Sequence, residues 1–441
     1  MAKTKRKRRD KKKKISPQQL EGQRKNEYRR KIVRLAKLVD AEDALPLIPK
    51  EDWNSICSTR FRAVRVEMGN DQVPKQLLAA TRKLFDFHLQ AGRISLTDDG
   101  YEMSIKDYVA VAHHMYFYIT DTQRICPLRV REKFAKLIEA VEGEEYSPPN
   151  ILLQITGLIN LQMSRMHRRM YYCRYKVEMH DVHINDCLYI YGFQHHKRKL
   201  RIRDFTRLAY RVGWCFADQG VIWSKVTGAQ FGYDNAWSKL PVRVYIQAHA
   251  LQRLKERLDI LNNSYLHLYL YLALKNLQVA RNKSGQQLIE FRYDGKKLGY
   301  LAFDLLGKNL VIRTFLFLTM DGTPEGEALQ DMLGIAAEDK KYLAIDKLST
   351  FIVSDIKDNP VVKQHFIDAG CGQLFEWEGA DFGQIQEVEQ ATMIQSYLGL
   401  NKPDPDPDPS VLIPNVSSEN TWLPQIQAEA PLLLPQSCLS S

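Results

Sequence analysis

The sequence predicts a multidomain α+β protein. We expect a mostly α-helical N-terminal region, a small α+β domain with an antiparallel sheet, a short helical C-terminal segment and disordered termini. Apolar residues recur with helical spacing through much of residues 46–235, and three alternating runs separated by turn residues follow at 287–319. The chain of 441 residues exceeds the usual size of one domain, so several compact units are expected.

The N-terminal segment 1–17 is predicted to be a disordered basic arm. Its first 14 residues carry ten Lys or Arg and one Asp, a low-complexity run that repels itself too strongly to pack. Residues 18–45 are predicted to continue the arm as a basic helix, because apolar residues recur there with helical spacing. Its apolar positions are Ile32, Leu35, Leu38 and Val39.

Residues 46–235 are predicted to be a mainly helical, basic RNA-binding region. Helical patterns cover 73–91, 104–118, 128–141 and 151–172. Within residues 164–203, ten Lys or Arg stand against three Asp or Glu and alternate with tyrosines. Tyrosine and arginine can stack on unpaired bases while lysine contacts phosphate. The predicted RNA-binding residues are Arg168, Arg169, Arg174, Lys197, Arg198, Lys199, Arg201 and Arg203; the alternative is a solvated basic face over a tyrosine-rich core.

The hydrophobic period changes near Leu240, where a compact α+β unit at 236–323 is predicted. A strand at 240–247 precedes helices at 248–261 and 265–279, and strands at 287–293, 297–304 and 309–319 form an antiparallel meander. Residues 324–400 are predicted to be an acidic helical segment. The Pro-Asp repeat at 403–409 cannot hold a helix, so residues 401–441 are predicted to be a disordered tail.

The net charge of +11 is distributed unevenly. Residues 1–14 carry +9, residues 320–441 carry −14, and the middle therefore carries +16. Concentrated positive charge attracts a polyanion and makes its binding sensitive to salt, and RNA is the expected partner. We also expect the acidic C-terminal part to act as an intramolecular inhibitor by competing for the basic surface.

Several classes of protein and site are not supported by the sequence. No run of 18 apolar residues occurs, the first 15 residues lack an apolar signal segment, and the seven cysteines are widely spaced with no Cys-x-x-Cys pair. A cytoplasmic protein without a membrane partner is expected. The motifs of nucleotide hydrolases, dinucleotide enzymes, serine hydrolases and zinc proteases are absent, and neither a cofactor nor a metal is expected.

The segment after the strand at 240–247 carries the candidate catalytic residues. On a helix, His249, Arg253 and Arg257 are spaced i, i+4, i+8 and share one face. Histidine and arginine together can move the protons and stabilise the phosphorane of metal-independent RNA cleavage. The alternative is that His249 caps the helix and the two arginines form a solvated face that pairs with Glu256.

The order of a strand, the motif His249-Ala-x-x-Arg253-x-x-x-Arg257 on a helix, a second helix and a meander resembles a known family. It is similar to RelE/ParE-like toxin domains of the barnase, EndoU, colicin and RelE ribonuclease group, over about residues 240–320. The resemblance implies endoribonuclease roles for these three residues and singles out Arg313 and Thr319 on the last strand. Strand alternation would place Arg313, Phe315, Phe317 and Thr319 on one face. The two phenylalanines are expected to pack under the C-terminal helices; the alternative is that they stack on bases.

These expectations define three functional hypotheses. The first is an RNA-binding protein with a toxin- or defence-like endoribonuclease domain, a hydrolase that uses His249, Arg253, Arg257 and Arg313. The second is a non-catalytic RNA-binding or ribosome-associated protein. The third is a toxin-like inhibitor that acts on a protein.

Overall fold

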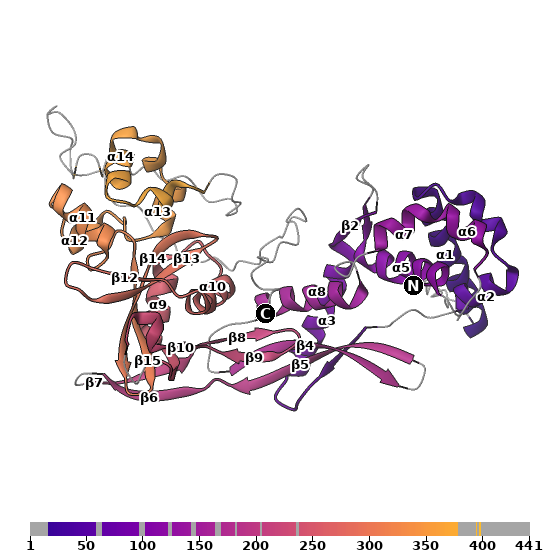
Figure 1. The fold of residues 1–441 in the computed structure, drawn as a ribbon, viewed down its shortest axis with the longest axis horizontal. Coiled ribbons are helices and arrows are strands. Elements are labelled where there is room, and N and C mark those ends of the chain that lie inside the picture. The colour runs from indigo at the N-terminus through magenta and orange to yellow at the C-terminus, as the bar shows by residue number, and fades with distance from the viewer. Residues whose placement is uncertain are drawn as a thin grey trace, which may run out of the picture.

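The computed structural model describes residues 16–58, 64–96, 102–121, 126–142, 147–163, 169–180, 183–202, 205–234 and 238–377, together with Ile394 and Tyr397. Figure 1 shows a helical lobe built from the N-terminal part of the chain and a second lobe built from the C-terminal half, joined by long strands. The predicted α+β class is confirmed. The predicted disorder of 1–17 is wrong at its end, because Ser16 and Pro17 begin the first helix, and the rest of that arm and the predicted disordered tail 401–441 lie outside the described residues.

The first lobe is built from helices around one core. Ser16 caps the first helix through a reciprocal bond pair with Gln19, and Pro17 occupies its first position. The helix ends at Leu38, so the predicted basic helix 18–45 is confirmed only in its first part; Pro46 lies in a short 3-10 helix that follows. The helices and 3-10 or π segments are α1 Pro17–Leu38, η1 Glu42–Leu47, α2 Lys50–Ser58, α3 Lys75–Ala91, α4 Ile105–Asp107, η2 Tyr108–Ala112, α5 His113–Thr120, α6 Leu128–Lys133, α7 Ala135–Val141 and α8 Pro148–Met163.

The prediction that residues 46–235 are mainly helical is wrong beyond Met163. Helical spacing in 151–172 continues only to the end of α8, and the described residues of 169–227 form strands and their connections. The tyrosine-rich run alternates, which fits a strand buried on one face better than a helix. The strands up to this point are β1 Arg65–Met68, β2 Arg93–Ser95, β3 Glu102–Ser104, β4 Arg169–His180, β5 His183–Gln194, β6 Lys197–Ile202, β7 Phe205–Arg211, β8 Gly213–Phe216, β9 Gly220–Trp223 and β10 Lys225–Thr227.

The hairpin of β4 and β5 links the two lobes, with β1 parallel to β5 on its other side. One face of this hairpin belongs to the core of the first lobe through Cys173, Tyr175, Leu188 and Ile190. Asn160 of α8 fixes the hairpin to the helices, because its side chain both donates to and accepts from the backbone of Cys173. The opposite face, which carries Tyr172, Tyr189 and Tyr191, is only half-buried.

The second lobe contains a large sheet with the strand order β12-β13-β14-β15-β11-β7-β6, and β10 pairs with β11. The predicted strand, two helices and meander are confirmed, with β11 parallel to β15. Helix α9 lies against β15. The elements are η4 Gly228–Phe231, β11 Pro241–Gln247, α9 Ala248–Arg257, α10 Asn263–Lys275, β12 Val279–Arg281, β13 Gln287–Tyr293, β14 Lys296–Leu306 and β15 Asn309–Phe317.

The acidic C-terminal segment belongs to the same lobe. Its helical character is confirmed by α11 Pro324–Leu333, α12 Ala337–Tyr342, α13 Leu348–Val353, η5 Asp355–Asp358, α14 Pro360–Asp368 and η6 Gly372–Phe375. Phe351 and Phe366 lie in one core cluster with the strands of the large sheet, so residues 236–323 and 324–377 do not form separate domains. The predicted basic helix 18–45 and the region 46–235 are not separate domains either, because Ile32 of α1 and Ile190 of β5 lie in the same core of the first lobe.

A search of the described helices finds none that combines the length and the apolar character needed to span a bilayer.

Candidate nucleic-acid interface

Helix α9 forms where the sequence predicts it and turns its apolar side to the large sheet. Ala250, Leu254 and the following Leu258 are buried in the main core of the second lobe. His249 is exposed in the first turn of the helix and has no hydrogen bond or ion pair within the described part of the chain. The predicted amphipathic helix is therefore present, with His249 accessible to solvent.

The two arginines of α9 have different environments. Arg253 forms an ion pair with Glu256 at 2.9 Å, with both side chains about two-fifths exposed. Arg257 is 9% exposed, and its guanidinium donates to the main-chain carbonyl of Phe315 in β15. Burial lowers the pKa of Arg257, while Asp346 nearby opposes that effect. Arg257 thus serves to attach α9 to the sheet and is not exposed to a phosphate.

Arg313 lies at an irregularity in β15. Ala302 pairs with Thr314 but Phe303 pairs with Ile312, so Arg313 is an extra residue without a cross-strand partner. The inserted residue reverses the alternation, and for this reason the prediction that Arg313, Phe315 and Phe317 share a face is wrong. Both phenylalanines are fully buried in the main core, and Phe317 contacts Phe351 of α13, as expected for rings under the C-terminal helices.

Arg313 and Thr319, the two residues singled out on the last strand, both bind to other parts of the second lobe. Arg313 Nε lies 2.9 Å from Asp304 Oδ2 in an ion pair. Thr319 is fully buried and donates to the carbonyl of Ile345 at 2.5 Å. The structure therefore does not bring four free catalytic groups together: His249 is exposed, Arg253 and Arg313 are paired with carboxylates, and Arg257 is buried.

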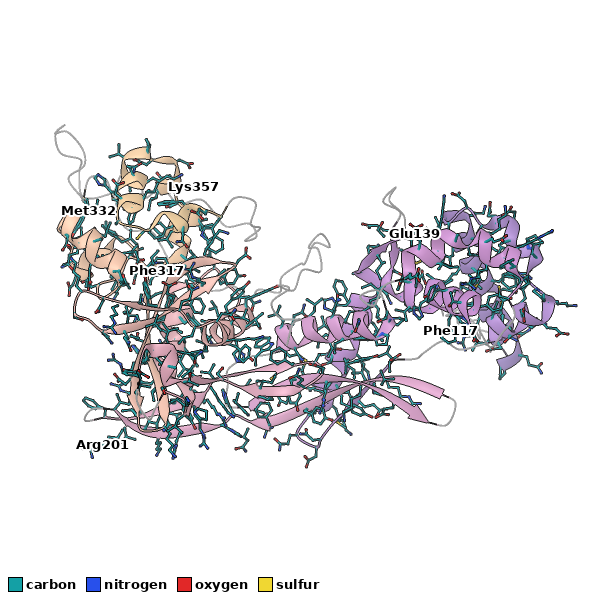
Figure 2. All side chains as sticks on the ribbon, in the orientation of Figure 1. Phe117, Glu139, Arg201, Phe317, Met332 and Lys357 are labelled. Carbon is teal, nitrogen blue, oxygen red and sulfur yellow. The ribbon has the colours of Figure 1, made fainter. Side chains whose placement is uncertain are left out.

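The predicted RNA-binding residues of β6 have a different environment. The hairpin of β6 and β7 forms the outer edge of the large sheet, and Figure 2 shows Arg201 projecting away from the lobe there. These cations are exposed, and none is in an ion pair among the residues that the structure describes. They are Lys197, Arg198, Lys199 and Arg201.

Registers within the sheet define which cations share a face. Arg198 pairs with Ala209, and Arg211 pairs with Tyr245, which pairs with Val311. Ala209, Tyr245 and Val311 form a small apolar cluster separate from the main core, so they lie on the side of the sheet away from α9. We call this side the arginine face; its cations by register are Arg198, Arg207, Arg211 and Arg243.

Three residues of the arginine face were missed in the sequence. Arg207, Arg211 and Arg243 lie outside the basic run at 164–203, on strands whose arginines are separated in sequence. Arg207 and Arg243 are exposed, and Arg211 lies 5.1 Å above the ring of Trp223. The signal available was the alternation in Arg207-Leu-Ala-Tyr-Arg211, which places two arginines four residues apart on one face of a strand.

The basic residues predicted on β4 are separated from one another. Arg174 pairs by register with Tyr189 on the half-buried face of the hairpin and donates to the carbonyl of Asp218 at 2.9 Å. Arg169 is exposed at the start of β4, on the alternate side from Arg174. Arg168 and Arg203 lie outside the described residues.

The acidic C-terminal segment uses several carboxylates inside its own lobe. Glu325 accepts from Lys297 at 2.5 Å, and Asp321 accepts from the buried Lys340 at 2.5 Å. Within the described residues no carboxylate of α11 to η6 pairs with a cation of the arginine face. Autoinhibition by this segment stays a prediction. Deleting residues 324–441 would not test it, because the deletion would also remove core residues such as Phe351.

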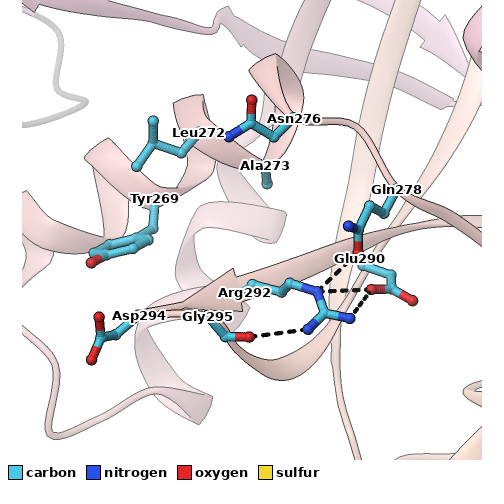
Figure 3. Close-up of a pocket in the computed structure, with 9 residues that line it drawn as sticks. All are labelled: Tyr269, Leu272, Ala273, Asn276, Gln278, Glu290, Arg292, Asp294 and Gly295. Carbon is cyan, nitrogen blue, oxygen red and sulfur yellow. Dashed lines mark hydrogen bonds and ion pairs between the residues drawn. The ribbon is translucent and has the colours of Figure 1, made fainter. Parts of the chain in front are cut away.

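Among the residues that the structure describes, neither a metal-binding cluster nor the pocket between α10 and β13 includes a predicted site residue. The described residues contain no group of three or more metal-binding side chains. Figure 3 shows a pocket between α10 and β13 in which Arg292 is held by Gln278, Glu290 and the carbonyl of Gly295. Its lining contains none of the predicted site residues.

No family model matches the chain, and no curated protein or solved structure matches it either.

Proposed function

We propose that the chain binds RNA through the arginine face, with further phosphate contacts from Lys197, Lys199 and Arg201, which strand alternation places on the other side of the same edge hairpin. The observation that carries the proposal is the concentration of exposed cations without ion pairs at one edge of the sheet. Elsewhere in the described structure many surface lysines and arginines are paired, as Lys133 is with Asp43 and Lys283 with Asp331. Uncompensated cations favour a polyanionic partner, and the arm of residues 1–14, with its +9 charge, would add phosphate contacts.

Fluorescence anisotropy with a labelled RNA tests this proposal. Replacing Arg243 with glutamate reverses one exposed charge on the arginine face and should weaken binding about tenfold, with a smaller dependence of affinity on salt. The matched control is Lys255→Glu on α9, which makes the same change in net charge at another exposed position. Equal losses from the two variants would show that only net charge matters and would reject the arginine face as the binding site.

RNA cleavage is a second candidate, favoured by one observation. His249 is exposed and unbonded in the first turn of α9, one turn before Arg253. An accessible imidazole can act as a general acid or base at neutral pH. Incubation of the purified chain with RNA should then give products that His249→Ala does not form, and intact RNA after incubation with the unaltered chain would reject cleavage.

A further inference from the structure

We infer that the RNA is held as a single strand, with unpaired bases stacked along a row of aromatic rings that leads to the arginine face; this inference rests on the proposed function. Successive rings are close neighbours, and they come from β5, from its partner β4, from β9 and from the link between β5 and β6. Tyr189 is 6.5 Å from Tyr191, which stacks on Tyr172 at 5.2 Å and 19°. We call these rings the aromatic row: Tyr189, Tyr191, Tyr172, Phe193, Trp223 and His196.

The row continues without a break from the β4–β5 hairpin to the large sheet. Phe193 lies 6.0 Å from Tyr172 and 6.2 Å from Trp223 of β9. Exposed His196 then stacks on Trp223 at 4.7 Å and 14°. The guanidinium of Arg211, on the arginine face, lies over the same indole. The rings and the cations therefore form one surface.

Glycines hold the rings in place. A Cβ on Gly69 would lie 2.5 Å from the ring of Tyr191, and one on Gly213 would lie 2.8 Å from the ring of Trp223. Tyr172 likewise contacts the position of a Cβ on Gly220 at 3.5 Å. These three rings thus lie over glycine backbone that has no side chain, so this part of the row is formed before any ligand binds. A preformed row lowers the entropy cost of ordering side chains on binding.

The rings are not fully covered. Tyr172, Tyr189, Tyr191, Phe193 and Trp223 are all half-buried, and His196 is exposed. Side chains that only completed a core would be buried, as Phe315 and Phe317 are. Aromatic rings that remain partly accessible beside cations are the arrangement that binds single-stranded nucleic acid, because every base has a face to stack.

Charge along the row gives it a direction. At the Tyr189 end, Lys176 lies over the ring and Glu178 accepts from the hydroxyl at 2.6 Å, with Glu67 opposite on β1. Anions and cations are therefore mixed there. At the Trp223 end the neighbouring charged groups are Arg211 and Arg243. We place phosphates on the arginines beside Trp223, and bases along the row from the tyrosines to His196.

A duplex fits this surface less well than an open strand. Base pairing and stacking hide the base faces of a duplex, so it could use the cations but not the rings. An unpaired DNA strand has the same base faces, and it is the second source of this chemistry. A peptide partner would use the apolar rings without needing the arginines.

The test compares three labelled probes with the full chain at one salt concentration. They are an unstructured 16-nucleotide RNA, the same RNA annealed to its complement, and DNA of the same sequence. The single-stranded RNA should bind at least tenfold more tightly than the duplex. Comparable binding of single-stranded DNA would assign the row to unpaired bases of either sugar, and much weaker binding would assign it to RNA.

Two variants and a control connect that preference to the row. His196→Ala removes the exposed terminal ring, and Tyr191→Leu keeps apolar bulk but removes an aromatic face; each should lower single-strand affinity about tenfold and leave duplex affinity unchanged. Phe117→Leu, on an exposed ring of α5, should change neither. Thermal unfolding of each variant checks its fold, and His196 is exposed, so its variant remains informative if Tyr191→Leu is destabilised.

The possible failures are separable. If duplex and single strand bind equally and both ring variants bind as the unaltered chain does, stacking is wrong while RNA binding stands. If no probe binds, the proposed function itself is wrong. If the ring variants lose a protein partner but no RNA affinity, the row is a protein-binding surface.

Discussion

Replacing Arg257 with alanine should destabilise the second lobe strongly. The guanidinium is buried, donates to the carbonyl of Phe315 and lies near the half-buried Asp346, so its loss leaves a main-chain carbonyl without its donor and removes a cation from beside that carboxylate. A buried hydrogen bond from a charged group contributes about 1.5–3 kcal/mol, and a buried acceptor left without a partner costs a similar amount. We expect a loss of about 3 kcal/mol.

Arg253→Ala is the matched control one turn earlier on the same helix. Its ion pair with Glu256 is between two partly exposed side chains, and such pairs contribute at most about 1 kcal/mol. Urea unfolding followed by circular dichroism should lower the midpoint by about 1–2 M for Arg257→Ala, and by less than half of that for Arg253→Ala. Equal stability of Arg257→Ala and the unaltered chain, together with a loss of RNA cleavage, would refute the structural role and favour a functional one.

The pH dependence of that deficit provides an independent check. Burial raises the pKa of Asp346, and the charge of Arg257 limits the rise. Without Arg257 the native-state pKa of Asp346 rises further above its unfolded value, which destabilises the fold at pH 7, where the carboxyl is ionised in the unfolded chain. This destabilisation disappears as the pH falls below both the native and the unfolded pKa of Asp346. The part of the stability loss of Arg257→Ala that is due to Asp346 should therefore shrink between pH 7 and pH 4. A deficit that is constant with pH would mean that Asp346 and Arg257 are not coupled.

Three further predictions concern the fold. Phe351→Ala removes a ring that contacts Phe317, Phe366 and Phe375, and it should lower the free energy of unfolding by about 3–5 kcal/mol. The control Met332→Ala, at a side chain of α11 that is 45% exposed, should change that free energy by about 0.5 kcal/mol or less. Equal effects of the two variants would contradict the packing of the acidic segment into the core. Gly326→Ala places a Cβ 1.9 Å from the carbonyl oxygen of Met320, so its melting temperature should be well below that of Gly334→Ala. At Gly334 a Cβ meets no atom, and the only cost is that of holding alanine at a positive φ, about 1–2 kcal/mol. Burial raises the pKa of the Cys173, Cys215 and Cys371 thiols to about 12, so iodoacetamide should label these three only after unfolding, and native labelling detected by mass spectrometry would contradict their burial.

Much of the second lobe could be predicted from the sequence because its periodicities are local. The alternation in 287–293 and 309–317 and the Asp294-Gly295 turn specify a meander, and the leucine stripe of 251–258 specifies the side of α9 that is buried. The face of Phe315 could not be predicted, because a single extra residue at Arg313 reverses the alternation and nothing in the local pattern signals it.

The candidate site was predictable only in part, for a related reason. The exposed cations of β6 follow one another in the sequence and were found. Arg207, Arg211 and Arg243 share a face with Arg198 only through strand pairing, which local composition does not encode. The aromatic row is similar: Tyr172 and Tyr191 belong to one tyrosine-rich run that folds into a hairpin, but Trp223 reaches Phe193 through the placement of a separate hairpin.

Burial explains why the helix motif was misleading. His249, Arg253 and Arg257 share a face on an isolated helix, but the last turn of α9 contacts β15, and the third residue is covered by the sheet. Spacing along one helix indicates which residues align, and only the packing of that helix decides which of them reach solvent.

Ultraviolet cross-linking of the full chain to a uridine-rich single-stranded RNA, followed by mass spectrometry of the peptides, tests the central claim most directly. We predict cross-links in peptides that contain Tyr191, Phe193 and Trp223, reduced in Arg243→Glu. Cross-links confined to the basic residues 1–14, or to α9 around His249, would contradict binding at the arginine face and the aromatic row.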